Sequence, residues 1–492
     1  MSMNTTPRQT SHLKREILVR LIRAYLSEDF AENTRLIPFA MRPKGSEVPY
    51  RCCIHKERAI LRDRTVAGLG MSIEDADDSV LLSTLAEKAL ERDLPETDPL
   101  TVLTSACKGC VPSRIYVTDL CQGCVARPCV NTCKFGAISV QNGKSVIDPA
   151  KCKNCGMCAQ VCPYQAITKI IVPCENACPV GAINKNEDGY AQIDFEKCIS
   201  CGKCVSACPF GAVHEKSQII DILKNIKAGK KVIAMVAPAI MGQLPCSPKQ
   251  LKEAILNLGF AEVYEVAQGA DITTRTEAAE FEERLEKGEE FMTTSCCAGY
   301  NELVDKHIPE MKPFRSDTKT PLYYTSEIVK REHPDAITVF FSPCNAKRKE
   351  AMKNPNVDFV LNYEELGAWF VALGVQVSEC GEIEFSYEAS SESRNYAVTG
   401  GVAQAVQKML PEHLPTYPVV INGLDKQSIR DLKKYAKNGV CELGNLIEVM
   451  ACQGGCLGGN GTVNAYKQAL KQLTNYVNES KSMAPEQETV EK

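Results

Sequence analysis

The sequence predicts an α+β multidomain protein with three parts: a helical N-terminal region (residues 1–104), a cysteine-rich repeat region (105–215), and an α/β domain with mostly parallel sheets (216–480). Three observations support this prediction. Apolar residues follow helical spacing in the first part, four similar cysteine-led runs recur in the second, and strand candidates alternate with helical patterns in the third. The polar, Glu-rich residues 481–492 are predicted to form a disordered tail.

The composition excludes several classes of function. The chain carries 57 Lys and Arg against 61 Asp and Glu, a net charge of −4, which argues against a bulk nucleic-acid or anionic-membrane surface. No stretch reaches the roughly 18 apolar residues of a transmembrane helix, and the N-terminus lacks the pattern of a secretory signal. The 26 Cys therefore indicate metal ligation in a cytoplasmic protein and not a disulfide framework.

The N-terminal region contains helical patterns but no catalytic motif. Apolar residues recur at helical spacing over Leu13–Leu26 and Leu81–Leu94. Between them, Arg51–Arg64 is basic and contains the adjacent Cys52 and Cys53. We expect this region to serve as a scaffold or docking element.

The middle region is an internal repeat of small, loop-rich units. Each unit contains a short run that begins with Cys and ends in two apolar residues: Cys133–Ile138, Cys162–Ile167, Cys178–Ile183 and Cys208–Val213. Strand-like pieces such as Ser145–Asp148 and Ala191–Asp194 lie between the runs. So few apolar residues cannot offset the entropy of ordering the chain, so metal ligation must stabilise these units.

The C-terminal domain alternates strand candidates with helical patterns. The strand candidates are Lys231–Ala237, Ile337–Phe341, Val357–Leu361 and Leu446–Ala451. Cysteine motifs fall near or just past strand candidates, and open α/β sheets usually bind ligands at the carboxyl ends of their strands. The cysteines are therefore expected to meet at one edge.

Two cysteine runs carry the spacing C-x2-C-x2-C-x3-C-P. They comprise Cys152, Cys155, Cys158 and Cys162, and Cys198, Cys201, Cys204 and Cys208. This is the bacterial ferredoxin signature for [4Fe–4S] clusters, in which the fourth Cys ligates the partner cluster. Zinc sites usually place a longer segment between two CxxC pairs, so the spacing disfavours zinc.

The remaining cysteines of the region can complete further clusters. The expected sets are Cys121, Cys124, Cys129 and Cys162; Cys133, Cys152, Cys155 and Cys158; Cys178, Cys198, Cys201 and Cys204; and Cys107, Cys110, Cys174 and Cys208. The fourth set is the least constrained by spacing. Alternatively, Cys107 and Cys110 are ordinary thiols and three clusters exist, or Cys52 and Cys53 compete for the position.

Three further motifs bring five cysteines together from distant segments. They are Thr294–Tyr300 (TSCCAGY), Ser342–Glu350 (SPCNAKRKE) and Glu448–Gly461 (EVMACQGGCLGGNG). Five Cys are one more than a [4Fe–4S] cube requires, and the glycines allow the backbone to approach a large inorganic group. The motifs indicate four thiolates around one cluster with a fifth thiol beside it.

These motifs resemble the three signatures of the [FeFe] hydrogenases, the iron-only hydrogenase large-subunit family, written TSCCPxW, MPCxxKxxE and ExMACxGGCxxGGG. The resemblance covers about residues 216–460, and the RCC segment and four-Cys insert are similar to a group B-type enzyme. It implies a two-lobed α/β domain that catalyses 2 H⁺ + 2 e⁻ ⇌ H₂. It also implies an H-cluster: a [4Fe–4S] cube bridged by Cys to a two-iron subsite with CO, cyanide and azadithiolate. The implied partners are a ferredoxin or similar low-potential carrier and dedicated maturation enzymes, without nucleic acid or membrane.

The resemblance also implies roles for particular residues. Cys297, Cys344, Cys452 and Cys456 would hold the cube, with Cys456 as the bridge to the two-iron subsite. Cys296 would be the proton-relay thiol, and Lys347 would donate hydrogen bonds to cyanide. Glu350 and Met450 would support the site from a second layer, and Pro238 belongs to an APA segment, Ala237–Ala239, that matches a family segment ending in Ser.

A proton route is expected beside the site. Glu277, Glu280 and Arg284 share one face of a predicted helix, and spacing alone would favour a solvated, salt-bridged face. The resemblance instead favours a relay through Glu280, Ser316, Glu277 and Cys296. Carboxyl, hydroxyl and thiol groups can each accept and donate a proton.

The chain departs from the family pattern at a few positions without losing an expected ligand. They are Ala239, Ala298, Tyr300, Ser342 and Asn460. The alternatives to a hydrogenase are a non-catalytic hydrogenase-like iron–sulfur protein, such as an assembly factor, a hydrogen sensor, or a plain multi-cluster electron carrier. The presence of Cys296 and Lys347 argues against the first of these, and no signalling domain supports the second.

Overall fold

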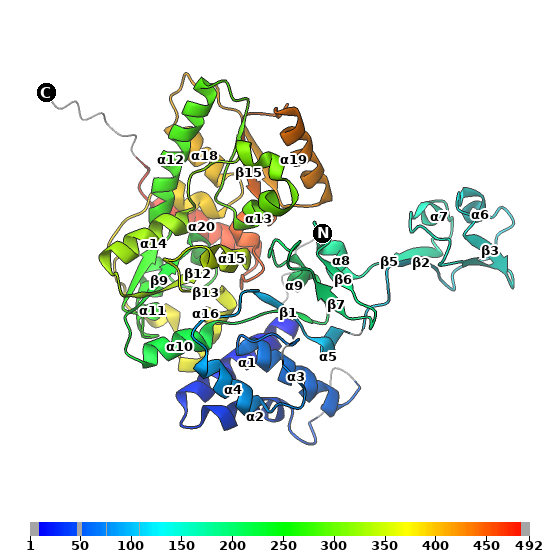
Figure 1. The fold of residues 1–492 in the computed structure, drawn as a ribbon, viewed down its shortest axis with the longest axis horizontal. Coiled ribbons are helices and arrows are strands. Elements are labelled where there is room, and N and C mark those ends of the chain that lie inside the picture. The colour runs from blue at the N-terminus through cyan, green and yellow to red at the C-terminus, as the bar shows by residue number, and fades with distance from the viewer. Residues whose placement is uncertain (1–8, 47–51, 75, 108, 484–492) are drawn as a thin grey trace.

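The computed structural model describes residues 9–46, 52–74, 76–107 and 109–483. In Figure 1 the N-terminal helices lie below the large α/β domain, and the cysteine-rich region extends from this body to one side. Within the described residues, no helix combines the length and the apolarity needed to cross a membrane. Most of the tail predicted over 481–492 lies outside the described residues, whereas Met483 is buried.

Four helices form the N-terminal part: α1 (Gln9–Leu26), α2 (Phe30–Met41), α3 (Ile54–Gly68) and α4 (Leu82–Glu91). The helices predicted over 13–26 and 81–94 therefore match α1 and α4. Helix α1 packs against α16 (Tyr363–Leu373) of the large domain, and Ile17, Leu18, Leu21 and Ile22 of α1 are almost fully buried. This burial joins the N-terminal helices to the rest of the molecule.

The cysteine-rich region is built from two-stranded antiparallel ladders and one-turn helices. The ladders pair β1 (Leu100–Val102) with β8 (Val213–Glu215), β2 (Arg114–Val117) with β5 (Ile167–Ile170), β3 (Ile138–Gln141) with β4 (Lys144–Ile147), and β6 (Ile183–Lys185) with β7 (Ala191–Ile193). The helices are α5 (Thr104–Cys107), α6 (Pro128–Thr132), α7 (Met157–Gln160), α8 (Pro173–Ala177) and α9 (Lys203–Ala207). The strands expected near 145 and 191 correspond to β4 and β7.

Residues 118–166, which we call the knob, project from the body on the β2–β5 ribbon (Figure 1). Val117 pairs with Ile167 at the end of the ribbon, and the Thr118 N–H donates to the Ala166 carbonyl over 2.7 Å. The knob therefore begins and ends at adjacent points of one ladder. The second half of the repeat, from α8 to β8, lies against the body.

The large domain contains two separate parallel sheets. One has the order β10 (Glu262–Glu265), β9 (Val232–Val236), β12 (Ile337–Phe341), β13 (Phe359–Leu361); the other has the order β11 (Met292–Thr293), β15 (Leu446–Met450), β14 (Pro418–Asn422). All strand pairs within them are parallel, which confirms the predicted sheet type. The four predicted strands match β9, β12, β13 and β15, whereas β10, β11 and β14 were not predicted.

Helices surround both sheets. They are α10 (Ile219–Lys227), α11 (Pro248–Leu256), α12 (Ala267–Glu286), α13 (Ala298–His307), α14 (Pro321–Glu332), α15 (Ala346–Met352), α16, α17 (Ser391–Arg394), α18 (Gly401–Met409), α19 (Lys426–Asn438) and α20 (Tyr466–Glu479). Five 3₁₀ segments are also described: η1 (Pro238–Gly242), η2 (Pro309–Phe314), η3 (Val377–Glu379), η4 (Asn395–Ala397) and η5 (Gly455–Gly458). The strands β9 and β15 are buried along their whole length, and β12 is buried from its second residue on, so the loops that follow them have fixed starting points.

Candidate metal centre and its connections

The three cysteine motifs follow the carboxyl ends of strands from both sheets. Cys297 comes after β11 and caps α13, and Cys344 lies between β12 and α15. Cys452 and Cys456 follow β15, in the loop that contains η5. The two sheets thus deliver these loops to one place, as expected for ligand sites in parallel α/β sheets.

Four of the five thiols line a single cavity of about 90 Å³, namely Cys296, Cys297, Cys344 and Cys456. Burial raises the pKa of Cys344 to about 11 and that of Cys456 to about 12, and neighbouring thiols add to both shifts. Burial also raises the pKa of Cys452, again reinforced by Cys344 and Cys297. Several closely spaced thiols that disfavour one another's ionisation fit a site completed by a cationic iron–sulfur core.

Two glycines shape the loop that carries Cys452 and Cys456. Gly454 and Gly455 have φ angles of +84° and +73°, which residues with a Cβ rarely adopt. The Ala451 N–H donates to Cys297 Sγ over 3.4 Å, a bond that would strengthen if the sulfur became a thiolate. The donor set therefore fits an iron–sulfur cluster held by Cys297, Cys344, Cys452 and Cys456.

Lys347 stands at the wall of the same cavity. Its Nζ donates to Glu350 Oε2 over 2.6 Å and to the Cys296 carbonyl over 3.3 Å. Thr320 donates a further bond to the other oxygen of Glu350. Glu350 thus positions a cation that faces the cavity, which suits an anionic ligand bound there.

The rest of the cavity wall is mainly apolar. Pro238 of η1, Leu322 and Phe340 line it, together with Met450 of β15, which is buried. An apolar wall excludes water and strengthens the electrostatic influence of Lys347. Pro238 and Met450, expected at the site from the sequence, are therefore both present in its wall.

The residues expected to form a proton relay lie between the cavity and the surface. Cys296 lies in the cavity, and the Glu277 carboxylate is the strongest charged influence on its thiol after burial. The Ser316 hydroxyl donates to Glu280 Oε2 over 2.7 Å and is near enough to Glu277 to lower the pKa of its carboxyl, whereas Glu277 Oε2 has no hydrogen-bond partner among the described residues. Ser316 further lines an open cavity of about 270 Å³ together with the exposed Asp317.

The two glutamates among these residues have opposite pKa shifts. Glu277 is fully buried, and this burial raises its pKa to about 8 despite a bond from the Ser295 N–H. Glu280 is partly buried, but bonds from Ser316, Thr318 and Arg284 outweigh the effect of burial and lower its pKa. A protonated inner carboxyl beside an ionised outer one is the arrangement that a proton route requires.

Arg284 fixes the outer glutamate. Its guanidinium pairs with Glu280 and Glu289 over 2.8 and 2.9 Å and donates to the Pro313 and Arg315 carbonyls. Arg284 therefore positions Glu280 and does not touch the cavity.

Sequence reasoning assigned no role to two buried residues of the site. Glu448 of β15 accepts bonds from the Gly400 and Ala403 N–H groups over 2.7 and 2.9 Å, so it joins β15 to the start of α18. Tyr363 lies close to Cys456 and Cys344, and its buried hydroxyl has no hydrogen-bond partner among the described residues. The first position of the third motif was the available signal for Glu448; no signal pointed to Tyr363.

The cysteines of the repeat gather in the expected sets of four in two cases. One cavity is lined by Cys133, Cys152, Cys155 and Cys158, and another by Cys178, Cys198, Cys201 and Cys204. Cys174 neighbours Cys208 and Cys107, and Cys110 neighbours the same two thiols. Cys121 and Cys129 both contact Ser145. Cys52 and Cys53 are exposed, with their Sγ atoms 3.8 Å apart.

The inner cysteine set adjoins the three-motif site. Cys201 is close enough to Cys452 to raise the pKa of its thiol further. A Cβ at Gly299 would lie 4.0 Å from Cys201 Cβ and 2.9 Å from Ala451 Cβ, so this glycine permits a close approach of the two regions. Clusters at these two sites would be neighbours.

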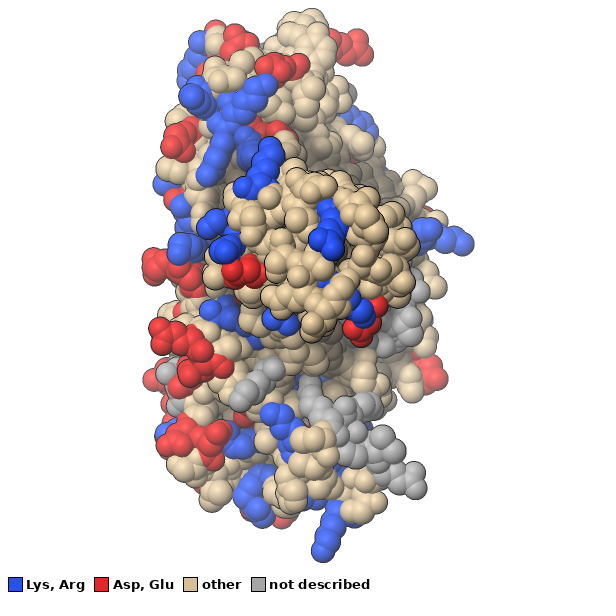
Figure 2. Space-filling view, turned by 90° about the vertical axis from the view of Figure 1, so that its right-hand side faces the viewer, with Lys and Arg blue, Asp and Glu red and all other residues tan. Residues whose placement is uncertain are grey.

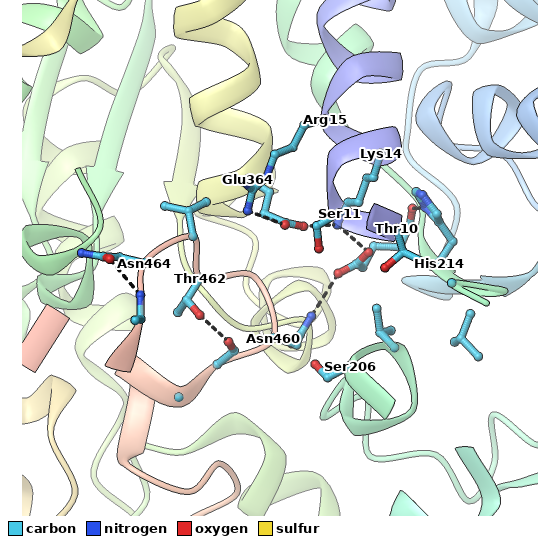
Figure 3. A pocket seen from close by; sticks show the side chains of 18 of the residues that line it. Thr10, Ser11, Lys14, Arg15, Ser206, His214, Glu364, Asn460, Thr462 and Asn464 are labelled. Atoms are coloured by element: carbon cyan, nitrogen blue, oxygen red, sulfur yellow. Dashed lines mark hydrogen bonds and ion pairs between the residues drawn. The ribbon is translucent and has the colours of Figure 1, made fainter. Parts of the chain in front are cut away.

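Two of the residues that depart from the hydrogenase signatures, Tyr300 and Asn460, have hydrogen-bond partners. The fully buried Tyr300 hydroxyl lies 2.7 Å from Thr293 Oγ1. Asn460 donates to Glu215 over 3.0 Å, in a cavity of about 280 Å³ between α1 and the loop after Cys456 (Figure 3). Asn460 thus connects that loop to the ion pairs of Lys14.

Comparison with known families matches two parts of the chain. Residues 145–168 and 191–214 match the family model for a 4Fe-4S binding domain. The chain is therefore an iron–sulfur protein. Residues 230–460 match the model for the C-terminal domain of the iron only hydrogenase large subunit. This match spans just under half of the chain and makes that part similar to the iron only hydrogenases.

Individual relatives are consistent with this assignment. The chain is 29% identical over 372 residues to the periplasmic [Fe] hydrogenase large subunit of Nitratidesulfovibrio vulgaris, a match to 64% of this chain and 85% of that protein. It is 25% identical to iron hydrogenase 1 of Clostridium pasteurianum, over 53% of this chain and 55% of that protein. The chain thus spans only about half of the second relative.

A solved [FeFe]-hydrogenase from Chlamydomonas reinhardtii is also similar. It is 20% identical, with 55% of this chain and 91% of that chain covered, and the TM-score is 0.44. This is a loose likeness, and the site assignments rest on the residues described above.

Proposed function

We propose that the protein is a ferredoxin-linked [FeFe] hydrogenase that interconverts protons, electrons and H₂. One observation carries the proposal: three distant motifs deliver four thiols, Cys296 among them, and a lysine to a single apolar cavity. Four thiols suffice for a cube, so Cys296 is available for proton transfer. When bound, an H-cluster would supply the iron chemistry that forms and splits H₂.

The chain's own residues would hold and supply this chemistry. Cys297, Cys344, Cys452 and Cys456 would ligate the cube, with Cys456 as the bridging residue. Lys347, positioned by Glu350, would bind an anionic cyanide ligand. Met450 and Pro238 would exclude water from the cavity.

Protons would move between solvent and the cavity through Glu280, Ser316, Glu277 and Cys296. Each station is a hydroxyl, carboxyl or thiol that can both receive and release a proton. Arg284 would hold Glu280 in the orientation that faces Ser316. The raised pKa of Glu277 favours a carboxyl that is protonated near neutral pH and close to the thiol.

Electrons would enter through the knob and pass along four [4Fe–4S] clusters, held by the four cysteine sets named above. The cluster of Cys178, Cys198, Cys201 and Cys204 would deliver them to the site, since Cys201 neighbours Cys452. The two parallel sheets would form the two lobes of the catalytic domain. We further propose a low-potential ferredoxin-like donor, dedicated maturation enzymes and a cytoplasmic location.

The test is anaerobic maturation followed by infrared spectroscopy and hydrogen assay. We expect bands from bound CO and cyanide, and H₂ evolution from a reduced donor. Cys296→Ala should retain the infrared bands and lose most of the activity, because it removes the relay thiol and no ligand. Full activity in this variant would refute the relay.

The alternative is a non-catalytic hydrogenase-like iron–sulfur protein, such as an assembly factor or a hydrogen sensor. Such a protein would contain iron and sulfide but would evolve no H₂ after maturation, and an assembly factor would also lack the infrared bands. Cys296 in the cavity and Lys347 at its wall favour the hydrogenase, because neither residue is needed to hold a cube alone.

A further inference from the structure

The knob presents an unusually apolar and basic surface. Its exposed side chains include Leu120, Val125, Phe135, Val146, Met157, Val161 and Tyr164. Over residues 114–170 the knob and its ribbon carry seven exposed Lys and Arg against two Asp, although the chain as a whole is acidic. Figure 2, which looks onto this side of the molecule, shows a mostly tan projection with scattered Lys and Arg side chains.

One part of this surface lies directly over a cysteine set. Phe135, Lys153 and Met157 line the same cavity as Cys133, Cys152, Cys155 and Cys158. Phe135, Met157 and Lys153 are exposed, and so is the thiol-bearing residue Cys155. A cluster at this position would therefore be close to solvent, beneath an apolar contact.

Lysines surround that contact. Lys134, Lys151 and Lys153 are all exposed, and Lys134 and Lys153 form no salt bridge within the part of the chain that the structure describes. Only Lys151 approaches a carboxylate, that of Asp148 at 3.8 Å. An apolar centre with a charged rim is the usual anatomy of a protein-docking surface.

We propose that Lys134, Phe135, Lys151, Lys153 and Met157 form the docking surface for an acidic one-electron redox protein. This inference rests on the proposed function and specifies its electron partner. The step is a single electron transfer: the partner's cluster is oxidised, the knob cluster is reduced, and no bond or proton is exchanged.

Electrostatics favour this partner. A [4Fe–4S] cluster with four thiolates is anionic, so two such clusters repel each other as they approach. A lysine rim offsets this repulsion and attracts a partner whose own rim is acidic, which increases the association rate. A contact of this kind is small and transient, as is usual for redox encounters.

The test compares two charge-reversal variants of the full chain with reconstituted clusters. The first is Lys134→Glu, Lys151→Glu and Lys153→Glu; the control is Lys426→Glu, Lys433→Glu and Lys437→Glu on the exposed face of α19. Both variants change the net charge equally. The probe is a reduced acidic two-[4Fe–4S] ferredoxin, and stopped-flow absorbance measures cluster reduction without any need for H₂.

We expect the knob variant to be reduced at least about tenfold more slowly at low ionic strength, with a weaker salt dependence, while the control matches the parent. Dithionite should reduce all three equally. Equal ferredoxin rates in parent and knob variant, or equal losses in both variants, would overturn the inference. If the knob variant fails to bind iron and sulfide, a second variant with Lys→Gln at the same three positions takes its place. Its ferredoxin rate, and the salt dependence of the rate in the parent, are then compared with the same expectations.

Two further outcomes distinguish a protein partner from a lipid surface, and docking from hydrogenase activity. Suppose that the knob variant keeps the ferredoxin rate of the parent, and that phosphatidylserine vesicles bind the parent but not the variant. This result would assign the surface to lipid and overturn the proposal. Rapid ferredoxin reduction of a parent that evolves no H₂, with slow reduction of the knob variant, would refute the hydrogenase function and support the docking surface.

Discussion

Glu277→Gln tests the physical state of the buried relay carboxyl. With a pKa of about 8, Glu277 is about nine-tenths protonated at pH 7, whereas a carboxyl at its ordinary value would be almost wholly ionised. A folded-state pKa above the unfolded value means that the folded chain binds the extra proton. Stability contributed by Glu277 is therefore present below about pH 4.5 and lost as the pH rises toward 8.

A rise of the Glu277 pKa from 4.5 to about 8 corresponds to a loss of order 5 kcal/mol in the free energy of unfolding over this pH range. Gln cannot ionise, so Glu277→Gln should gain stability relative to the parent as the pH rises from 5 to 9. Denaturant unfolding of both chains across this range measures the difference. A constant difference, or one that falls with pH, would refute the assignment of a neutral carboxyl at Glu277.

An independent measurement reads the same proton directly. An infrared difference titration should show the C=O stretch of a protonated carboxyl near neutral pH, and Glu277→Gln should remove it. The variant should also lose hydrogenase activity by about a hundredfold or more, as expected when a proton-transfer group is removed. Absence of the carboxyl band in the parent at pH 7 would contradict the raised pKa.

Three other substitutions follow from the same geometry. Arg284→Gln should raise the pKa of Glu280 toward its ordinary value, which would move the acidic limb of the pH–activity profile upward; an unchanged profile would separate Arg284 from the relay. Tyr363→Phe removes a hydroxyl that would donate one bond worth about 1 kcal/mol to the cluster, so it should lower the reduction potential of the site cube by about 40 mV. A redox titration followed by electron paramagnetic resonance measures this potential. Gly299→Ala would place a Cβ 2.9 Å from Ala451 Cβ and should destabilise the chain by about 1–3 kcal/mol in denaturant unfolding, whereas full stability would show that the two regions can separate.

The sequence was most informative where local pattern and structure coincide. Buried strands such as β9 and β12 are continuous apolar runs, and the cysteine motifs that follow them carry their own spacing. The two sets of four cysteines that contain Cys133 and Cys178 could be proposed from the sequence. The reason is that ferredoxin-like spacing indicates which cysteine of a run ligates the neighbouring cluster.

The features that the sequence did not predict depend on distant partners. Strand β14 starts with Pro418 and alternates between half-buried and exposed positions, and β11 has two residues, so neither provides a clear apolar run. The orientation of Tyr363 toward Cys456 follows from the packing of α16, which no local pattern reveals. The partners of Glu448 lie more than forty residues away along the chain.

The ion pairs of Lys14 determine where this protein can be shortened. Lys14 of α1 is buried and contacts Glu215 over 2.7 Å and Glu364 over 2.9 Å (Figure 3). Removal of α1 would leave two buried carboxylates without their cation, a change that typically costs several kcal/mol. Because Glu215 also accepts a hydrogen bond from Asn460 in the loop after Cys456, a minimal fragment for spectroscopy should keep residues 9–26 even though they contain no cysteine.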